Sequence, residues 1–213
     1  MLYALDQQRR ARREIAFPGV PLERLKDVVT AQPPRTSDDL LAILRHTLAR
    51  VQLELRGNDT DSIIKYWRDD GQPRGEDRCT DALTEDLARL LPNLGIRRVP
   101  QADMPNGKIA DLLYEAGEAA LPIEAKGQWN AKLWTAAGDQ LDAFYVRDWR
   151  VQDRGIYLVY WFGPDVDANF RLKSPPGGAP RPETPEALRL ALIESLPPTR
   201  RGSIWIEVLD LTR

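Results

Sequence analysis

Three side chains near the middle of the chain have the types and spacing that could bind a divalent cation beside an ammonium group. Asp111 lies in an expected strand over residues 108–115, and Glu124 and Lys126 lie in the next, over residues 119–126. Because side chains alternate along a strand, Glu124 and Lys126 point to the same side. If the two strands pair as a hairpin, Asp111 comes beside them. The sequence therefore predicts two carboxylates and one amine at a single site.

Such a group of charges favours Mg²⁺ chemistry on a phosphate. Two neighbouring carboxylates repel each other unless a cation or a proton compensates them. Mg²⁺ prefers oxygen ligands and keeps several waters, so that one or two carboxylates can hold it. A bound ion lowers the pKa of a coordinated water and neutralises charge on a phosphate. We expect Asp111 and Glu124 to bind Mg²⁺, with Mn²⁺ as a substitute. Lys126 could orient the attacking water, help to deprotonate it or stabilise the phosphate, and these alternatives remain open.

The arrangement of Ala110-Asp111 followed by Glu124-Ala125-Lys126 resembles the PD-(D/E)xK superfamily, also called restriction-endonuclease-like. In that family an Asp on one strand is followed, on the next strand, by an acidic residue, any residue and a Lys. Ala110 stands where the family often has Pro. The resemblance covers residues 77–165. It implies a metal-dependent nuclease that hydrolyses phosphodiester bonds, in DNA rather than RNA.

The resemblance also implies two further site residues on helices. Family members often carry a Glu on the helix before the core strands, and Glu85 in the expected helix over residues 80–91 matches it as an additional metal ligand. Glu85 fits a solvated helix position equally well. Many members place a Gln on the helix after the second strand. Gln140, in the expected helix over residues 133–145, matches that element as a positioning residue of the catalytic site, and Phe144 fits the aromatic that follows.

Polar and aromatic residues around the motif could contact a nucleic acid. Trp129 could stack on a base or wall the site, whereas Trp134 is expected to pack within its helix. Gln128 and Asn130 could contact a phosphate or a base edge. Lys108 could approach a phosphate, although a surface position is the simpler expectation.

The pattern of apolar and turn-forming residues predicts an α/β fold with a mixed central sheet flanked by helices. The segment Asp69–Glu76 is rich in turn formers and separates a helical N-terminal region, residues 1–70, from a nuclease-like domain, residues 71–213. The strong amphipathic run over residues 40–55 predicts a helix in the first region. The expected elements of the second are strands at 96–100, 108–115, 119–126, 155–162 and 203–209 and helices at 80–91, 133–145 and 185–195.

Composition sets limits on the class of protein. The chain has 213 residues, of which 42% are apolar and 29% charged, as in soluble globular proteins. It lacks an apolar run of the roughly 20 residues that cross a membrane, and its first residues do not resemble a secretory signal. Cys79 is the single cysteine and His46 the single histidine, so the sequence offers neither an internal disulfide nor a Cys/His metal site. We therefore expect a cytoplasmic protein that does not bind membranes.

The charge balance leaves a second function open. The chain has 30 basic and 32 acidic residues, for a net charge of −2, whereas DNA-binding domains are often strongly basic. The nuclease hypothesis implies a nucleic-acid partner, pairing as a homodimer to cut two strands, and a place in bacterial restriction, phage defence or repair within a larger assembly. The competing hypothesis is a non-catalytic nuclease-like module that holds a partner protein. A small-molecule enzyme is a third, but the sequence has no glycine-rich phosphate loop and no nucleophile elbow.

Overall fold

The computed structural model describes residues 33–57, 62–91, 93–99, 103–104, 108–145 and 149–213. The chain divides into two compact units, residues 1–33 and residues 34–213, and the second contains every described helix and strand. Side chains are not described at residues 103, 104, 108, 109, 140, 142–145 and 149. No helix in these described stretches is long and apolar enough to cross a membrane.

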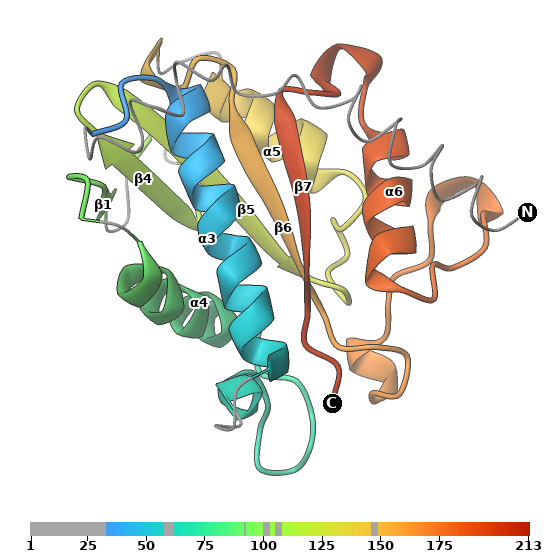
Figure 1. Ribbon diagram of the computed structural model, residues 1–213. Helices are drawn as coiled ribbons and strands as arrows, with labels where there is room; N and C mark the ends of the chain where they lie inside the picture. Colours follow the sequence, from blue (N-terminus) through green and yellow to red (C-terminus); the bar gives the residue numbers. More distant parts are fainter. Residues whose placement is uncertain (1–32, 58–61, 92, 100–102, 105–107, 146–148) are drawn as a thin grey trace, which may run out of the picture. The chain divides into compact units, whose positions relative to one another are not determined.

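A five-stranded mixed sheet forms the centre of the second unit (Figure 1). Its strands, in spatial order, are β1 (Arg97–Val99), β4 (Leu112–Ala116), β5 (Ala119–Gly127), β6 (Gly155–Trp161) and β7 (Ile204–Asp210). Strand β4 runs antiparallel to both of its neighbours, β1 and β5, whereas β5, β6 and β7 run parallel to one another. A separate two-stranded ladder joins β2 (Asp103–Met104) to β3 (Lys108–Ile109). The predicted α/β class with a mixed sheet is confirmed.

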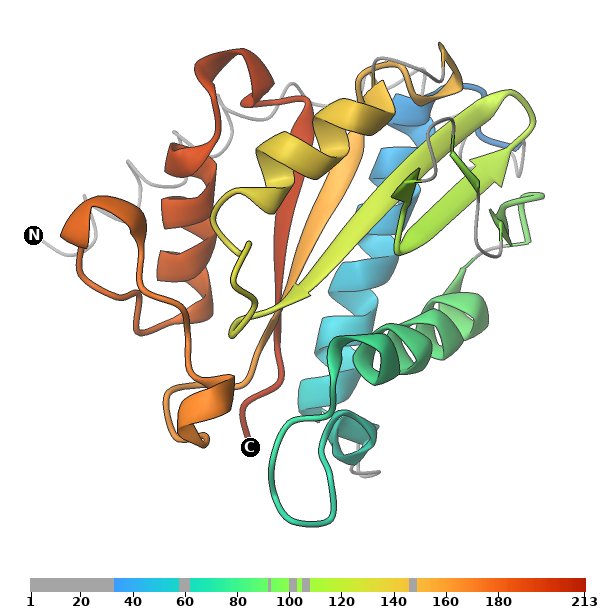
Figure 2. The same ribbon diagram turned by 180° about the vertical axis from the view of Figure 1, so that it is seen from behind.

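Helices cover both faces of the sheet (Figures 1 and 2). On one face lie α3 (Ser37–Gly57) and α4 (Glu76–Leu90), and on the other lie α5 (Ala136–Tyr145) and α6 (Pro185–Ser195). Because β5 and β6 are buried along their whole length, they can be apolar on both sides, as parallel strands in layered folds usually are. Single-turn 3-10 helices complete the unit at Ser62–Tyr66, Trp149–Val151, Ala168–Phe170, Pro176–Gly178 and Pro198–Arg200.

Helix α3 belongs to the same unit as the sheet, which corrects the expected boundary after residue 70. Its buried side chains share one core with the sheet residues Leu121, Ile123 and Leu158; these helix residues are Leu40, Leu44, Leu48, Val51 and Leu55. At its first turn, Ser37 Oγ donates a hydrogen bond to the carbonyl of Ala120, at 3.1 Å. The unit therefore begins at Pro34 rather than at Gly71. The helices expected before residue 33 lie outside the described residues.

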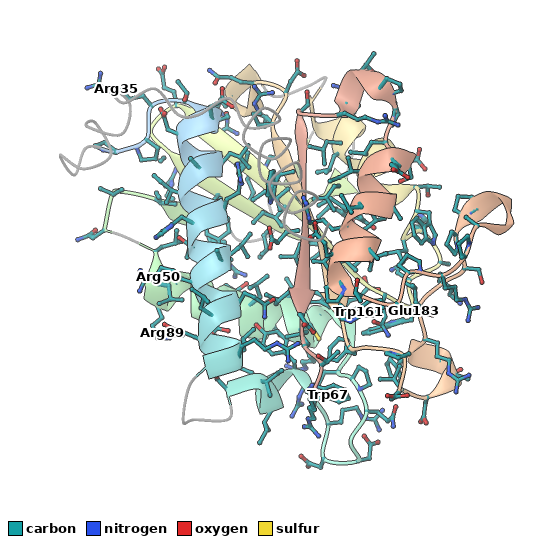
Figure 3. All side chains as sticks on the ribbon, turned by 45° about the vertical axis from the view of Figure 1, so that its right-hand side comes forward. Arg35, Arg50, Trp67, Arg89, Trp161 and Glu183 are labelled. Carbon is teal, nitrogen blue, oxygen red and sulfur yellow. The ribbon has the colours of Figure 1, made fainter. Side chains whose placement is uncertain are left out.

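Two side-chain contacts hold α4 to α3 and the end of the chain to the core, and Figure 3 labels one residue of each, Arg89 and Trp67. Arg89 on α4 pairs with Glu54 on α3. Near the lower end of α3, the Trp67 indole N–H donates to the carbonyl of Leu211, at 3.0 Å, and so holds the last residues of the chain against the core.

Two local differences from the expected elements bear on the site. Helix α4 begins at Glu76, four residues before the expected start at Thr80, because Gly75 serves as its N-cap. The acidic first turn of Glu76 and Asp77 is favourable at a helix N-terminus, where the backbone N–H groups point outward. The expected strand over residues 108–115 is broken, with Ala110 and Asp111 lying between β3 and β4.

Candidate active site

Asp111, Glu124 and Lys126 converge on one side of the sheet. The β4–β5 register pairs Leu112 with Ile123, so one step further along the ladder brings Asp111 opposite Glu124. The Lys126 ammonium contacts Glu124 Oε1 and lies 3.3 Å from Asp111 Oδ2. Alternation along β5 puts Glu124 and Lys126 on the side that faces α5 and α6, while Ile123 and Ala125 pack toward α3 and α4.

The break before β4 turns the Asp111 carboxylate toward β5. Its Oδ2 accepts a hydrogen bond of 2.8 Å from the backbone N–H of Ala125, which lies beyond the last β4–β5 residue pair. The carboxylate therefore satisfies a backbone donor and contacts the Lys126 ammonium at the same time. This double contact fixes the side chain in the site.

Burial differs sharply across the three groups. The side chain of Glu124 is 2% exposed and that of Lys126 is 10% exposed, whereas Asp111 is 34% exposed. Glu124 and Lys126 are thus enclosed by the fold, and Asp111 connects them to solvent. A buried carboxylate is costly unless a cation or hydrogen-bond donor compensates it.

The charges shift one another's pKa values. Burial, together with the neighbouring Asp111, raises the pKa of Glu124 to about 7 against the opposing effect of Lys126. For Lys126, burial alone would lower the pKa, but Glu124 and Asp111 outweigh burial, so the net pKa is raised. The ammonium therefore stays protonated at neutral pH. Glu124 remains only partly compensated by this one cation.

This donor set fits a hard divalent cation that keeps water ligands. Asp111 offers a solvent-connected carboxylate, and Glu124 offers a buried one whose raised pKa reports unrelieved negative charge. Among the described residues, no three acidic, histidine or cysteine side chains gather closely enough to hold a metal by themselves. Mg²⁺ suits such a pair because it is commonly held by one or two carboxylates and several waters.

Comparisons of the chain with protein-family models, curated proteins and solved structures find no significant match. The site is therefore interpreted from its own geometry.

The acidic residue that α4 brings near these charges is Glu76, not the expected Glu85. Glu85 is exposed, and it follows Glu76 by about two and a half helical turns, which places the two on opposite sides of α4. The charge of Glu76 is one contribution to the raised pKa of Lys126, after those of Glu124 and Asp111. The expected helix start at Thr80 placed Glu76 in a loop. With the N-cap at Gly75, Glu76 instead lies in the first turn of α4.

Three other residues singled out in the sequence, Lys108, Gln140 and Phe144, have side chains outside the described residues. Gln140 lies within α5, but its side chain is outside the described residues, as is that of Phe144. The side chain of Lys108, in β3, is likewise outside them. A role for Gln140 as a positioning residue therefore stays a prediction.

Gln128 ties two loops together and is not available to a phosphate. Its side chain is fully buried. The amide nitrogen donates to the carbonyls of Gly163 and Phe170, at 2.8 and 2.9 Å, and the amide oxygen accepts from the N–H of Phe162, at 2.9 Å. All of these partners belong to the segment after β6. Gln128 thus joins the loop that follows Lys126 to the loop that follows the neighbouring strand.

Trp129 packs within this loop pair and is not an open stacking surface. Its ring meets Phe170 edge-on, with centroids 4.9 Å apart, and is tilted against Phe162 at 5.7 Å. The same ring covers Gly127, where an added Cβ would lie 2.5 Å from the indole. Trp134 is half-buried, and its indole N–H donates to the carbonyl of Lys173, at 3.1 Å. These aromatic residues hold the segment beyond Lys126 in place.

Asn130 contacts the acidic residue of α4 instead of facing solvent as a base-reading group. Its Nδ2 donates to Glu76 Oε1, at 2.6 Å, and its Oδ1 accepts from the backbone N–H of Lys132, at 2.8 Å. The loop after β5 therefore reaches the first turn of α4, on the far side of the sheet from α5.

Proposed function

We propose that this chain is a divalent-metal-dependent nuclease that hydrolyses phosphodiester bonds. The observation that carries the proposal is the meeting of the Asp111 and Glu124 carboxylates with the Lys126 ammonium on two adjacent strands. The raised pKa of Glu124 supports it, because the buried carboxylate lacks full compensation and a cation beside it would supply the rest.

The order of the elements supports a restriction-endonuclease-like fold for residues 34–213. Helix α4 precedes the sheet, Asp111 precedes β4, Glu124 and Lys126 lie on β5, and α5 follows. This is the order in which the PD-(D/E)xK pattern arranges its acidic residue, its acidic-x-Lys element and the helices around them. The resemblance, rather than any contact in this chain, favours DNA over RNA and a role in bacterial defence or repair.

Each side chain has a role that follows from its environment. Asp111 and Glu124 would hold Mg²⁺. When bound, the ion would activate a water and neutralise charge on the phosphate. Because the pKa of Lys126 is raised, its ammonium donates hydrogen bonds and positive charge instead of accepting a proton. It would therefore orient the attacking water or stabilise the phosphate as charge develops.

Cleavage assays test the proposal directly. The full chain is incubated with plasmid and with single-stranded DNA, in Mg²⁺, Mn²⁺ or EDTA. Cleavage is expected with either metal and not with EDTA. Lys126→Ala should keep the fold but lose at least about 100-fold in rate, a loss typical of a removed electrostatic stabiliser. Lys173→Ala, which removes an exposed lysine from the loop after β6, is the matched control. Full activity of Lys126→Ala would rule out the mechanism.

Metal binding is a second, independent readout. Asp111→Ala removes the carboxylate that connects the site to solvent, so Mn²⁺ affinity measured by calorimetry should fall by about tenfold or more. Glu85→Gln, on the exposed side of α4, should bind Mn²⁺ as the unaltered chain does. Equal affinity of Asp111→Ala and the unaltered chain would place the ion elsewhere.

One observation favours the alternative of a non-catalytic interaction module. Lys126 already contacts both carboxylates, so the network is satisfied in part without any metal. The net charge of −2 also gives no general attraction to nucleic acid. If the chain neither binds Mn²⁺ nor cleaves DNA or RNA, the three charges are a buried structural network, and a module that holds a partner protein in a larger assembly is the better description.

A further inference from the structure

The turn between β5 and α5 is fixed by hydrogen bonds and borders the site described above. The carbonyl of Lys132 accepts from the N–H of Ala136, at 2.8 Å. The carbonyl of Leu133 accepts from the Tyr157 hydroxyl, at 2.7 Å. Tyr157 is the partner of Glu124 in the β5–β6 ladder, and such partners lie side by side on adjacent strands. The turn is therefore held beside the candidate active site.

Trp134 lies in this turn and presents a half-exposed indole that is held in place. Part of the ring packs against the core on the side of α5 and α6. Its N–H donates to the carbonyl of Lys173, at 3.1 Å, so the ring cannot turn freely. The half-exposed indole of Trp205 differs, because the Arg45 guanidinium lies over it, 3.4 Å from the ring centre. Trp134 therefore offers a fixed aromatic surface next to the site.

Two exposed cations flank this indole. Lys132 precedes it by two residues in the same turn, and no carboxylate of the described residues pairs with the Lys132 ammonium. Arg181 donates from two nitrogens to Ser174 Oγ, at 2.8 and 3.2 Å. Ser174 directly follows the residue whose carbonyl holds the indole, and its hydroxyl is neutral, so Arg181 keeps its charge close to Trp134. The turn and the loop after β6 thus combine one aromatic surface with two positive charges.

This combination suits a nucleic acid strand whose bases are unpaired. Bases stack on aromatic side chains with little regard to sequence, while cations contact the phosphates between them. In a duplex, neighbouring base pairs cover both faces of each internal base, so an indole on the protein surface has no base face to stack on. The net charge of −2 also gives the chain no broad basic surface that would hold a duplex by its phosphates alone.

We propose that Trp134, with Lys132 and Arg181, forms a subsite that holds an unpaired nucleotide of the substrate beside the active site. The proposal rests on the proposed function and names its preferred substrate, a single strand or the unpaired part of a duplex. A base stacked on Trp134 fixes the strand, so that a nearby phosphate reaches the carboxylates and Lys126. Stacking selects single strands, and the two cations add affinity without reading sequence.

Equilibrium binding in EDTA tests this subsite without cleavage. The full chain is titrated into a fluorescein-labelled single strand of about 12 nucleotides, into its duplex form and into the same strand with abasic sugars. The unaltered chain should bind the normal single strand at least about tenfold more tightly than the other two, because one stacked base contributes about that factor. The abasic strand tests stacking on the unaltered chain, so this result does not depend on the folding of a variant.

Two substitutions of Trp134 separate stacking from packing. Trp134→Leu keeps an apolar side chain and should lose the preference for the normal single strand. Trp134→Phe keeps an aromatic face without the indole N–H and should retain most of that preference. Equal binding of the three oligonucleotides by the unaltered chain, or an unchanged preference in Trp134→Leu, would overturn the proposal.

The two cations are tested by the salt dependence of the same binding. Lys132→Ala and Arg181→Ala should each weaken binding of the single strand and lower the slope of log affinity against log salt by about 0.7, the value for one phosphate contact. Arg50→Ala is the matched control, because it removes an exposed arginine from α3, on the opposite face of the sheet (Figure 3). Slopes that change alike in all three variants would contradict these phosphate contacts.

These measurements also distinguish the subsite from the proposed function. If the unaltered chain cleaves DNA while Trp134→Leu keeps its preference for single strands, only the subsite fails. If the chain binds single strands through Trp134 but cleaves nothing in Mg²⁺ or Mn²⁺, the nuclease proposal fails and the surface remains one that binds nucleic acid.

Discussion

At the scale of single residues, Glu124 is the buried carboxylate of the site, and burial disfavours its charged form. It is almost fully enclosed, it faces Asp111, and Lys126 is the cation that contacts it. Such a carboxylate contributes differently to folding in its charged and neutral forms. Its titration is therefore a property of the folded protein that can be measured even without a substrate.

Glu124 makes folding less favourable as pH rises. Its pKa is about 7 in the folded chain and 4.5 for an ordinary Glu, so between these values the folded chain holds a proton that the unfolded chain has released. The free energy of unfolding should therefore fall as pH rises from 4.5 to 7, by up to about 3 kcal/mol for this group alone. Glu124→Gln should lack this part of the slope, as measured by urea unfolding in EDTA at pH 5, 6, 7 and 8.

The matched control for the pH experiment is Glu85→Gln. Glu85 is exposed on α4, so its replacement should leave the pH dependence of the unaltered chain in place. Parallel curves for Glu124→Gln and the unaltered chain over the same pH range would contradict the raised pKa.

The residue pattern on β5 was predictable because strand alternation is a local rule. Glu124 and Lys126 share a side of the sheet whatever the rest of the chain does. The neighbour relation with Asp111 needed only a short hairpin, and Gly117, with φ of 56°, supplies the turn between β4 and β5. The place of Glu76 was not predictable in the same way. It depends on where α4 begins and on a contact with Asn130 across 54 positions of sequence.

At the scale of elements, the end of β5 is held by the fit of Trp129 over Gly127. A Cβ at Gly127 would lie 2.5 Å from the indole, which is closer than real contacts allow. The ring is held from other directions by Phe162 and Phe170, so it cannot move aside freely. The absence of a side chain at this one position therefore lets the loop fold back over the strand that carries Lys126.

Gly127→Ala should destabilise the fold through this contact. The expected loss is about 1–3 kcal/mol in the free energy of unfolding, as for other overpacked sites, measured by urea titration with tryptophan fluorescence. Gly138→Ala is the control: Gly138 lies within α5, an added Cβ meets only Pro197 at 4.0 Å, and the change should be neutral or stabilising. Combining Gly127→Ala with Trp129→Leu should recover part of the loss. An unchanged free energy of unfolding for Gly127→Ala alone would contradict the packing argument.

The loops beyond β5 and β6 show how the fold engages polar residues that were expected to contact a ligand. Gln128 and Asn130 are polar residues after a catalytic-type motif, which favours a ligand-binding interpretation from sequence alone. In the fold, Gln128 bonds three backbone groups of the segment at residues 162–170. These are long-range contacts, and no local rule of periodicity or spacing encodes them. Polar residues in a buried loop are most often engaged by the backbone.

At the scale of the whole molecule, the boundary of the folded unit follows the core and not the turn-rich segment. Composition placed the boundary at the Asp69–Glu76 loop, where turn formers gather. The buried side of α3 instead packs with Leu121, Ile123 and Leu158 of the sheet. A long loop between two helices of one layer looks the same in sequence as a linker between two domains, because only burial distinguishes them.

Two shortened chains test this boundary. A chain of residues 34–213 keeps both layers of helices and should unfold cooperatively, as followed by far-ultraviolet circular dichroism during heating. A chain of residues 71–213 loses α3 and exposes the sheet residues that its leucines cover, including Leu121 and Ile123. Because each buried Leu contributes about 1.5–3 kcal/mol and a domain is stable by only about 5–15 kcal/mol, the loss of α3 exceeds what the remaining core can offset. The shorter chain should therefore show no cooperative transition and should aggregate. A sharp transition of the 71–213 chain near that of the 34–213 chain would mean that α3 is an accessory to the unit that contains the sheet and not part of its core.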